Sequence, residues 1–504
     1  MIDSRVLDQM FTAQETSPRS VDDVIAQATF ADKLRLCPEL FGKPFHQLGI
    51  DAQNAIALRR LQQMINSMLL NPLWREHLAQ AGFSAAPQDL DEWQRLPITD
   101  RDTLDTFFMK KREGMVVPMT HGGFEVIASG GTSSGLPAET VYSQRELHDT
   151  YEIAGQFIGT FVLPGFLGCG EIKWIIMTLT DADMWSSGTM IGGVLQRTPG
   201  VNYVAGGALS ENVFHHIMSF EGTKAVMGMS REIEALIPLG RSMPAADRET
   251  FRLAIYGSGI IQKKKLAELK DLYPNLEVLS YFASNQAEAI GLQLDPTGYL
   301  TSVPGLHLIE IVDADGRWVK VGEEGELLVT RLHAKEAPII RMKLGDRMIR
   351  REPLVSDELV AERFEFAGRS SDILHIGESH HAARTVYTRL SDLLREAGFL
   401  EIDRESHEVQ FQNDRNERVL CLVASVDDPE ERTRQLARDF STEQLRSYFV
   451  DALKDGLPFF DRNEKRYAAL EKTAYRFGIK LVAPDSTEIH RTRVGKTPLI
   501  KDFL

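Results

Sequence analysis

The first 95 residues have the apolar spacing of helices. One stretch repeats apolar residues at intervals of three and four positions, which places them on a single face of an α-helix. The residues of this stretch are Ala55, Leu58, Leu61, Ile65, Leu69 and Leu70. Pro72 follows. Because proline lacks the backbone N–H that a helix interior needs, we expect the helix to stop there.

The middle of the chain, residues 96–366, alternates apolar runs typical of strands with helical patterns. The runs are FEVIAS, KWIIMTL, KAVMGM, RLAIYG, LEVLSYF, LHLIEIV and GELLVTR. Strands that alternate with helices predict an α/β domain with a largely parallel sheet. The later runs follow one another closely, which predicts an antiparallel part. From Gly368 onward, shorter strands lie between long charged helices, so we expect a smaller α+β domain and a hinge near residues 367–372.

Composition narrows the class of protein. The chain has 504 residues, of which 43% are hydrophobic and 26% charged, close to the globular average, which excludes disorder, collagen and coiled coil. Its 57 Lys and Arg against 72 Asp and Glu give a net charge of −15. A nucleic-acid-binding protein normally needs a basic face, so we expect no nucleic-acid partner. The 3 cysteines form no C-x-x-C pair, which excludes a disulfide scaffold.

No targeting or membrane segment is visible in the sequence. The N-terminus, MIDSRVLDQMF, lacks a cationic segment followed by an apolar core, so it does not resemble a signal peptide. The most apolar stretch, residues 157–169, is broken by Pro164 and is too short to span a bilayer. We therefore expect a soluble cytoplasmic protein with no membrane partner.

The most informative segment is a loop that follows the run FEVIAS. It consists only of Gly, Ser and Thr: Ser129, Gly130, Gly131, Thr132, Ser133, Ser134 and Gly135. Small residues let backbone N–H groups converge on one anion, and hydroxyls add donors that can also reach a metal. This composition suits a triphosphate. A flexible surface linker is the alternative explanation.

Two other catalytic motifs fit this region less well. Gly131 to Gly135 spells G-x-S-x-G, the elbow of serine hydrolases, which requires a helix directly after the serine. The residues that follow read as a turn and a strand, so we discount a hydrolase. No lysine follows Gly135 as a Walker A loop requires, and Gly257-Ser-Gly259 lacks the third glycine of a dinucleotide fingerprint.

The order of six segments is more specific than any one of them. They are SGGTSSGLP, IYGSG, SNQAE, GELLVT with IIRMKLGD, GRSSDIL and RTRVGK. In this order they resemble the adenylate-forming (acyl/aryl-CoA synthetase) superfamily, and most closely the phenylacetate–CoA ligase family. The resemblance runs from about residue 70 to 504. It implies a helical N-terminal extension over residues 1–70, a large ATP- and carboxylate-binding domain over 71–367, and a small mobile domain over 368–504.

The resemblance assigns roles to individual residues. Ser129 to Gly135 would wrap the phosphates of ATP, and Glu288, with Thr132, would bind Mg²⁺. Asp346 would accept hydrogen bonds from the ribose hydroxyls. Arg369 and Lys496 would be the catalytic cations, since their charges stabilise the reacting phosphate. The remaining nucleotide-binding residues would be Gly257, Ser258, Gly259, Ser284 and Asn285.

Three residues depart from the family pattern. Leu136 stands where the loop usually has lysine, which shifts phosphate binding towards the backbone and the metal. Ser284 replaces an aromatic residue expected to stack on adenine; Tyr281 or Phe282 are its possible replacements. Ser371 occupies the usual acidic or lysine position of the hinge.

The function implied is activation of an aromatic or acyl carboxylic acid with ATP and Mg²⁺, giving an acyl-adenylate and pyrophosphate. The acyl group would then pass to a thiol, with CoA as the expected cofactor. Alternatives are transfer to a carrier protein or an amine, or a nucleotide-binding regulator without turnover.

We expect the acid to bind between residues 157–185 and 226–230. Methionines 177, 184, 190 and 227 lie in or near these segments. The sequence leaves open whether the protein forms a homodimer.

Overall fold

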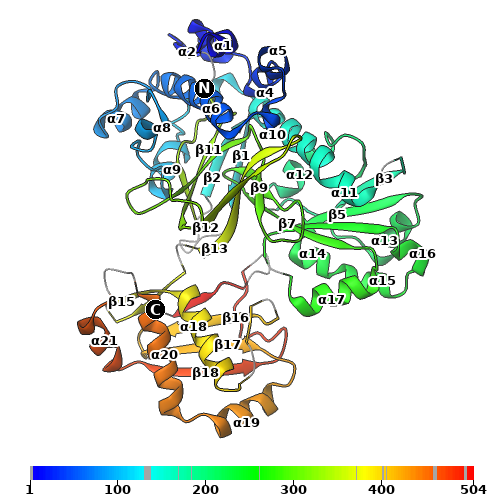
Figure 1. Ribbon diagram of the computed structural model, residues 1–504, viewed down its shortest axis with the longest axis vertical. Coiled ribbons are helices and arrows are strands. Elements are labelled where there is room, and N and C mark those ends of the chain that lie inside the picture. The colour runs from blue at the N-terminus through cyan, green and yellow to red at the C-terminus, as the bar shows by residue number, and fades with distance from the viewer. Residues whose placement is uncertain are drawn as a thin grey trace. The chain divides into compact units, whose positions relative to one another are not determined.

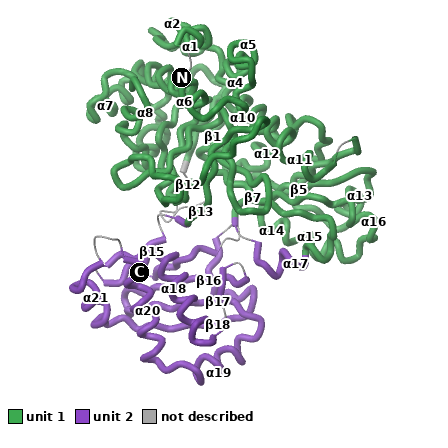
Figure 2. The backbone as a smooth tube through the Cα atoms, viewed as in Figure 1, with its two compact units in different colours: residues 1–258, 269–367 green, residues 259–268, 368–504 purple. Residues whose placement is uncertain are grey.

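The structure is a computed structural model of the chain. It describes residues 4–129, 138–168, 170–182, 184–259, 261–369, 372–377, 379–399, 402–404, 406–457, 462–492 and 497–503. The chain divides into two compact units, which Figure 2 shows in different colours. The first unit contains residues 1–258 and 269–367, and the second contains residues 259–268 and 368–504.

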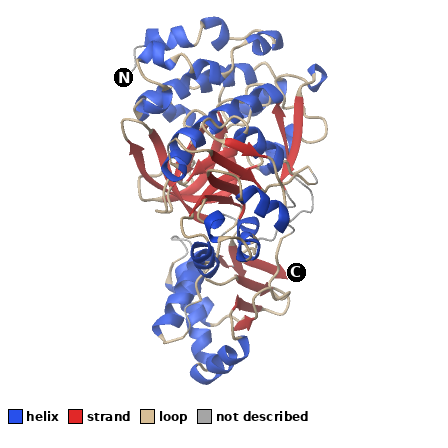
Figure 3. Cartoon of the chain, turned by 90° about the vertical axis from the view of Figure 1, so that its right-hand side faces the viewer, coloured by secondary structure: helices blue, strands red, loops and turns tan. Residues whose placement is uncertain are grey.

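Short helices dominate the start of the first unit, and Figure 3 shows them gathered at one end of it. They are α1 (Ser4–Met10), α2 (Ala13–Thr16), α3 (Val21–Ala26), α4 (Phe30–Leu34), α5 (Cys37–Phe41), η1 (Phe45–Gln47), α6 (Ile50–Met68), α7 (Pro72–Gln80), α8 (Leu90–Trp93) and α9 (Arg101–Phe108). The predicted amphipathic helix is α6, and it ends four residues before Pro72. Pro72 instead begins α7, where its missing N–H needs no partner.

These helices share a core with later parts of the first unit. Buried Phe30, Leu61 and Trp74 belong to the same hydrophobic cluster as Leu332 and Ile340. Residues 4–70 therefore contribute to the folding of the first unit rather than forming a separate body.

The main sheet explains how the middle of the chain is organised (Figure 1). In the described residues it has 11 strands, whose order is β10 (His307–Val312), β11 (Glu324–Arg331), β12 (Met342–Val355), β13 (Val360–Arg369), β9 (Leu300–Ser302), β8 (Glu288–Leu292), β7 (Glu277–Ser284), β6 (Phe251–Gly257), β5 (Thr223–Met229), β3 (Lys173–Met177) and β4 (Asn202–Val204). Strands β4, β3, β5, β6 and β7 pair in parallel. From β7 to β8 the pairing turns antiparallel, as the closely spaced later runs predicted.

Helices connect the parallel strands, since a parallel pair needs a crossover. They are α12 (Ser187–Leu195), α13 (Glu211–Met218), α14 (Ser230–Glu234), α15 (Leu236–Arg241), α16 (Ala245–Arg248) and α17 (Lys263–Leu272). Three further helices, α10 (Gln144–Phe157), η3 (Ile158–Val162) and α11 (Leu163–Leu167), precede β3. The run FEVIAS forms β1 (Phe124–Ser129), which pairs with β2 (Ala138–Ser143) in a separate two-stranded ribbon. Turn η2 (Met119–His121) precedes it.

The second unit is a smaller α+β body. Its four-stranded sheet has the order β18 (Arg476–Val482), β17 (Val419–Ser425), β16 (Val409–Asp414) and β19 (Ile500–Phe503). Its other elements are β14 (Ile373–Ile376), β15 (Ser379–Ala382), α18 (Ala383–Glu396), α19 (Pro429–Asp439), α20 (Thr442–Gly456) and α21 (Glu464–Glu471). Leu390, Phe411 and Phe449 are fully buried in its core. In neither unit does a described helix have the length and apolar character needed to cross a membrane.

A buried lysine ties the N-terminal helices to the rest of the first unit. The Lys335 Nζ donates hydrogen bonds to the carbonyls of Val24 and Gln27, at 2.7 and 2.8 Å, where α3 ends. A cation at a helix C-terminus satisfies carbonyls that have no partner within the helix. Burial, together with the charges of Arg60 and Arg145, lowers the pKa of Lys335 to about 7.

This pKa predicts a dependence of stability on pH. An unfolded lysine titrates near 10.4, so between about pH 7 and 10 the unfolded chain binds more protons at this site than the folded chain. Stability contributed by Lys335 should therefore rise with pH across that window. Thermal melts from pH 7 to 9.5 should show the wild type gaining stability relative to Lys335→Gln. Parallel curves for the two proteins would contradict the assignment.

Candidate functional site

The candidate site lies where the parallel strands end. Strands β3, β5, β6 and β7 run in the same direction, so their carboxyl ends meet at one edge of the sheet, where α/β proteins commonly bind ligands. Gly257 and Ser284 are the last residues of β6 and β7. Both were predicted nucleotide-binding residues, and the topology brings them to this edge.

The Gly/Ser/Thr segment joins β1 to β2. Ser129 ends β1 and is paired in register with Ala138 of β2, while the predicted site residues Gly130, Gly131, Thr132, Ser133, Ser134 and Gly135 lie outside the described residues. The next described element after Ser133 is a strand rather than a helix. This order argues against the serine-hydrolase elbow, which places a helix directly after the nucleophile.

A buried amide joins this ribbon to the main sheet. The Asn285 side chain donates a hydrogen bond of 2.6 Å to the carbonyl of Ala128, one residue before Ser129. The Tyr142 hydroxyl on β2 donates to the backbone carbonyl of Asn285, also at 2.6 Å. Two motifs that are 157 residues apart in the sequence are thus in direct contact.

The turn after β6 has a packing reason for its glycine. A Cβ placed on Gly257 would lie 2.6 Å from the Tyr281 ring, so any side chain there would displace the tyrosine. Ser258 follows with φ of 67° and Gly259 with φ of 146°, a conformation that favours small residues. Tyr281, which we considered as a substitute for the missing aromatic, lies against this turn.

Glu288 is held in an unusual backbone conformation. It opens β8 directly opposite Ser284, with φ of 43°, in the left-handed region that non-glycine residues rarely adopt. A β-bulge interrupts the β7–β8 pairing beside it. Bulges and left-handed residues are concentrated at functional sites, where they aim a side chain.

Two histidines hold the buried Glu288 carboxylate. Its Oε2 lies 3.0 Å from His307 Nε2 and its Oε1 lies 3.2 Å from His333 Nε2. Arg331, which is paired with His307 across β10 and β11, brings its Nη1 to 3.7 Å from Oε1. The Arg331 guanidinium also stacks over the Tyr142 ring at 4.3 Å, so the cluster is connected to the ribbon.

These neighbours keep Glu288 ionised. Burial alone would raise the pKa of Glu288, but the charge of His333 and the hydrogen bonds from both histidines outweigh it and hold that pKa well below its usual range. Burial lowers the pKa of His307. Neither histidine can be recognised from the sequence, because each is a single histidine 19 or more residues from Glu288 and no fixed spacing marks them as ligands.

The cluster can hold a metal ion. The ligand atoms of Glu288, His307 and His333 all lie within 4.8 Å of one another. Mg²⁺ usually takes only one or two carboxylates from a protein beside nucleotide phosphates and water, so Glu288 fits that role. However, both of its oxygens already face imidazoles, so an ion bound there requires at least one histidine to withdraw or to become a ligand itself.

The remaining predicted site residues are Asp346, Arg369 and Lys496. Asp346 is buried on β12, in the antiparallel half of the same sheet, after Gly345 with φ of 79°. Arg369 ends β13 and belongs to the second unit. Lys496 lies outside the described residues. The roles of these three residues therefore stay predictions.

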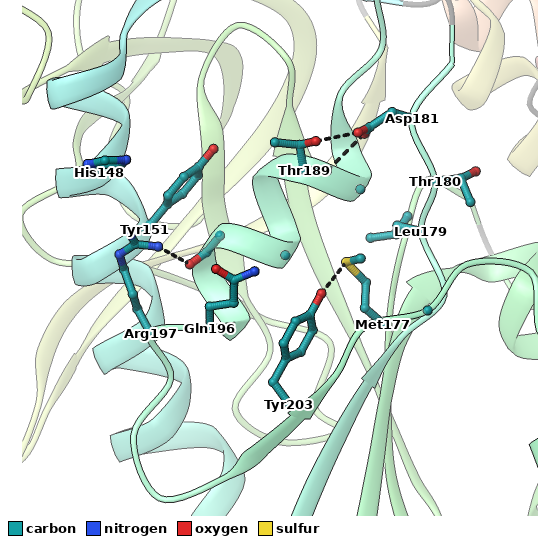
Figure 4. A pocket seen from close by; sticks show the side chains of 14 residues that line it. His148, Tyr151, Met177, Leu179, Thr180, Asp181, Thr189, Gln196, Arg197 and Tyr203 are labelled. Carbon is teal, nitrogen blue, oxygen red and sulfur yellow. Dashed lines mark hydrogen bonds between the residues drawn. The ribbon is translucent and has the colours of Figure 1, made fainter. Parts of the chain in front are cut away.

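A pocket opens beside the candidate site, between α10, α12, β3 and β4 (Figure 4). Its volume is about 560 Å³. It is lined by His148, Tyr151, Met177, Leu179, Thr180, Asp181, Gly188, Thr189, Gly192, Gly193, Gln196, Arg197, Tyr203 and Gly206. Of the four methionines considered for the acid site, Met177 lines the pocket, whereas Met190 and Met227 are buried in the core.

Glycines on α12 leave room for this pocket. A Cβ on Gly192 would lie 3.2 Å from the Tyr203 hydroxyl oxygen, and one on Gly193 would lie 2.4 Å from the Tyr151 ring. The first glycine therefore lets the pocket extend along the helix, and the second lets α10 approach α12. No sequence motif marks the pocket's polar residues, because they come from α10, α12, β4 and the connecting segments between them.

Asn285 allows a direct test of how the ribbon is attached. Replacing it with alanine leaves the buried Ala128 carbonyl without a donor, which should cost about 1–3 kcal/mol of unfolding free energy. Asn275→Ala is a matched control, because Asn275 donates a 2.9 Å bond from an exposed position to the carbonyl of Glu249. Denaturant melts should show a clearly larger loss for Asn285→Ala; equal losses would contradict this view.

Comparison with known proteins supports the fold. No family model matches the chain, and no curated protein sequence matches it. Among solved structures, a 2-hydroxyisobutyryl-CoA ligase in its postadenylation state with 2-HIB-AMP has a TM-score of 0.61 at 15% identity, covering 90% of each chain. The AtGH3.15 acyl acid amido synthetase in complex with 2,4-DB has a TM-score of 0.58 at 13% identity, covering 94% of each chain. At such low identity these likenesses establish the fold alone: the chain has the α/β fold of adenylate-forming enzymes, as its motifs predicted.

Proposed function

We propose that this protein is an ATP-dependent, AMP-forming ligase that activates a carboxylic acid. The observation that carries the proposal is the bond from Asn285 to Ala128, because it joins the predicted phosphate-binding segment to the predicted acidic turn at the carboxyl edge of the sheet. The motifs of this sequence resemble most closely those of the phenylacetate–CoA ligase family. Two structural neighbours act on acids: one holds 2-HIB-AMP and the other is an acyl acid amido synthetase.

The roles follow from the chemistry of adenylation. The acid's carboxylate oxygen attacks the α-phosphorus of ATP, and the bond from that phosphorus to the bridging oxygen breaks to release pyrophosphate. Ser129 to Gly135 would hold the β- and γ-phosphates through backbone and hydroxyl donors. Glu288, assisted by Thr132, would hold Mg²⁺, which neutralises phosphate charge when bound. Asp346 would accept hydrogen bonds from the ribose, and Arg369 and Lys496 would stabilise the charge at the α-phosphate.

The pocket is well placed for the acid. The backbone N–H of Ala128 donates to the carbonyl of Met184, at 2.8 Å, so the strand that leads to the phosphate-binding segment is attached to the segment after β3. Thr180 and Asp181 of that segment line the pocket. An acid bound there would have one end beside the Thr180–Asp181 segment and the adenylation site.

The acceptor in the second step is proposed to be CoA, on the motif resemblance and on a neighbour solved with 2-HIB-AMP and CoA, which has a TM-score of 0.55. An amine is the second candidate, because an acyl acid amido synthetase is about as similar in structure. We propose that residues 368–504 move between the two steps, as in the family that the motifs resemble.

Lys496 tests the proposed chemistry. Carboxylate-dependent exchange between pyrophosphate and ATP should appear with at least one acid from a varied panel. Lys496→Ala should lower this exchange on the order of 10²–10³-fold while ATP binding persists, because it removes one preorganised charge from the transition state. Lys472→Ala, at an exposed position of the same unit, should leave exchange unchanged. Exchange that survives in Lys496→Ala would reject the assigned role, and the absence of exchange with every acid would favour a non-catalytic nucleotide-binding protein.

Glu288 provides a separate test of the metal. Glu288→Gln should lower exchange on the order of 10²-fold and raise the Mg²⁺ concentration needed for half-maximal rate. Glu268→Gln, a substitution on α17, is the control for loss of one charge. A normal melting temperature would show that the fold is intact. An unchanged Mg²⁺ requirement in a folded Glu288→Gln protein would show that the carboxylate does not hold the metal.

A further inference from the structure

The pocket beside the site has two chemically different ends (Figure 4). One end contains Thr180 and Asp181, next to the segment that β1 contacts. The other end contains His148, Gln196 and Arg197. Helix α12 runs between them. From Thr189 to Gln196 is seven residues, or about 10 Å at 1.5 Å per residue.

The Asp181 carboxylate, at the end of the pocket near Thr180, already accepts hydrogen bonds within the protein. Asp181 accepts hydrogen bonds from the backbone N–H and from the hydroxyl of Thr189 in the first turn of α12. An acceptor at a helix N-terminus satisfies free N–H groups and complements the helix dipole. Asp181 therefore does not offer its charge to the far end of the pocket.

At the far end, Arg197 carries a charge that no carboxylate of the described residues balances. Its guanidinium lies over the Tyr151 ring at 5.4 Å, and Nη1 donates to the Gly193 carbonyl at 3.0 Å. These contacts orient the group but are made to neutral partners. Among the residues that the structure describes, Arg197 forms no ion pair with a carboxylate. Arginine in this setting is the side chain best suited to bind a ligand carboxylate in bidentate fashion.

Further donors accompany this arginine. The side chains of His148 and Gln196 have no hydrogen-bond partner among the described residues, and the same holds for the hydroxyl of Tyr151, which also lines the pocket. Burial raises the pKa of Tyr151, so its hydroxyl remains a donor. A cluster of donors around one cation is complementary to a ligand group that has several acceptor atoms and a negative charge.

Between its two ends the pocket has apolar lining residues. Met177, Leu179 and Gly192 are among them, so the part of the ligand between its two ends should be apolar. The volume of about 560 Å³ falls within the range of sites for drug-sized molecules and is far more than a short acid needs.

From these observations, and resting on the proposed function, we propose that the substrate is a long dicarboxylic acid. One carboxylate lies near Thr180 and Asp181 and is adenylated, and the other, about 10 Å away along α12, is bound by Arg197. Arg197 thereby determines specificity and takes no part in bond making or breaking.

The test compares acids that differ only at the far end. Pyrophosphate exchange is measured with α,ω-dicarboxylates of four to twelve carbons and with the monocarboxylate of each length, and with 4-carboxyphenylacetate against phenylacetate. The wild type should prefer the longer diacids by about tenfold or more in kcat/KM, the equivalent of 1.4 kcal/mol. Arg197→Met should lose that preference by weakening diacids alone, and Arg197→Lys should retain part of it.

Two further variants sharpen the result. Arg75→Met is the matched control, because Arg75 is exposed and likewise donates to backbone carbonyls, those of Leu69 and Leu70; its preference should equal that of the wild type. Arg197→Glu should shift the preference to ω-amino acids of the same length. A wild type that uses monoacids as well as diacids, or a diacid preference that survives Arg197→Met, would overturn the proposal.

Failure of the proposed function can be distinguished from failure of this inference. If no acid supports exchange, calorimetric titration of the full-length protein with suberate and with octanoate measures the pocket without turnover. Suberate binding that is lost in Arg197→Met and kept in Arg75→Met would support the dicarboxylate site even though the ligase assignment had failed. Absence of suberate binding, or binding that Arg197→Met leaves unchanged, would reject it.

Discussion

The arrangement of the whole site depends on how a two-stranded ribbon is attached to a sheet of which it is not a part. Strands β1 and β2 pair only with each other in the described residues, so no ladder of the main sheet fixes their position. Hydrogen bonds to neighbouring elements do so instead: those that involve Asn285, Tyr142 and Met184, and one from the Arg331 side chain to the Val141 carbonyl. Because a buried amide that loses its partner is costly, this attachment sets where the glycine-rich connection begins.

The second constraint is electrostatic. A carboxylate as buried as Glu288 would normally be neutral, and the protein keeps it charged with two imidazoles and a guanidinium. Imidazole is also the commonest metal ligand in proteins, so the cluster contains groups that can themselves bind a cation. The left-handed backbone at Glu288 shows that the fold tolerates local strain in order to place this side chain.

Much of the fold could be predicted from the sequence, because strand and helix periodicities were regular and the motifs occurred in a recognisable order. Asn285 and Glu288 could be singled out as candidates in this way, since both lie within one short motif, and their roles stay predictions. His307 and His333 could not be found, because the register of β10 with β11 and the β7–β8 hairpin bring them to Glu288 across long stretches of chain. Arg197 was also missed: its significance lies in the absence of a carboxylate partner among the described residues, which no sequence pattern records. The end of α6 was misplaced because proline can begin a helix as well as stop one.

The glycines of α12 have a consequence for how such a protein could change over time. The depth of the pocket is set by glycines on a helix outside the predicted nucleotide motifs, and the atoms nearest to a Cβ on Gly192 would be those of Tyr203 and Met177. A single added methyl group at this position would shorten the space available while β1, the Glu288 cluster and the strand edge stayed as they are. The volume of the pocket and the geometry of the Glu288 cluster are therefore set by separate parts of the first unit, so that one can vary without the other.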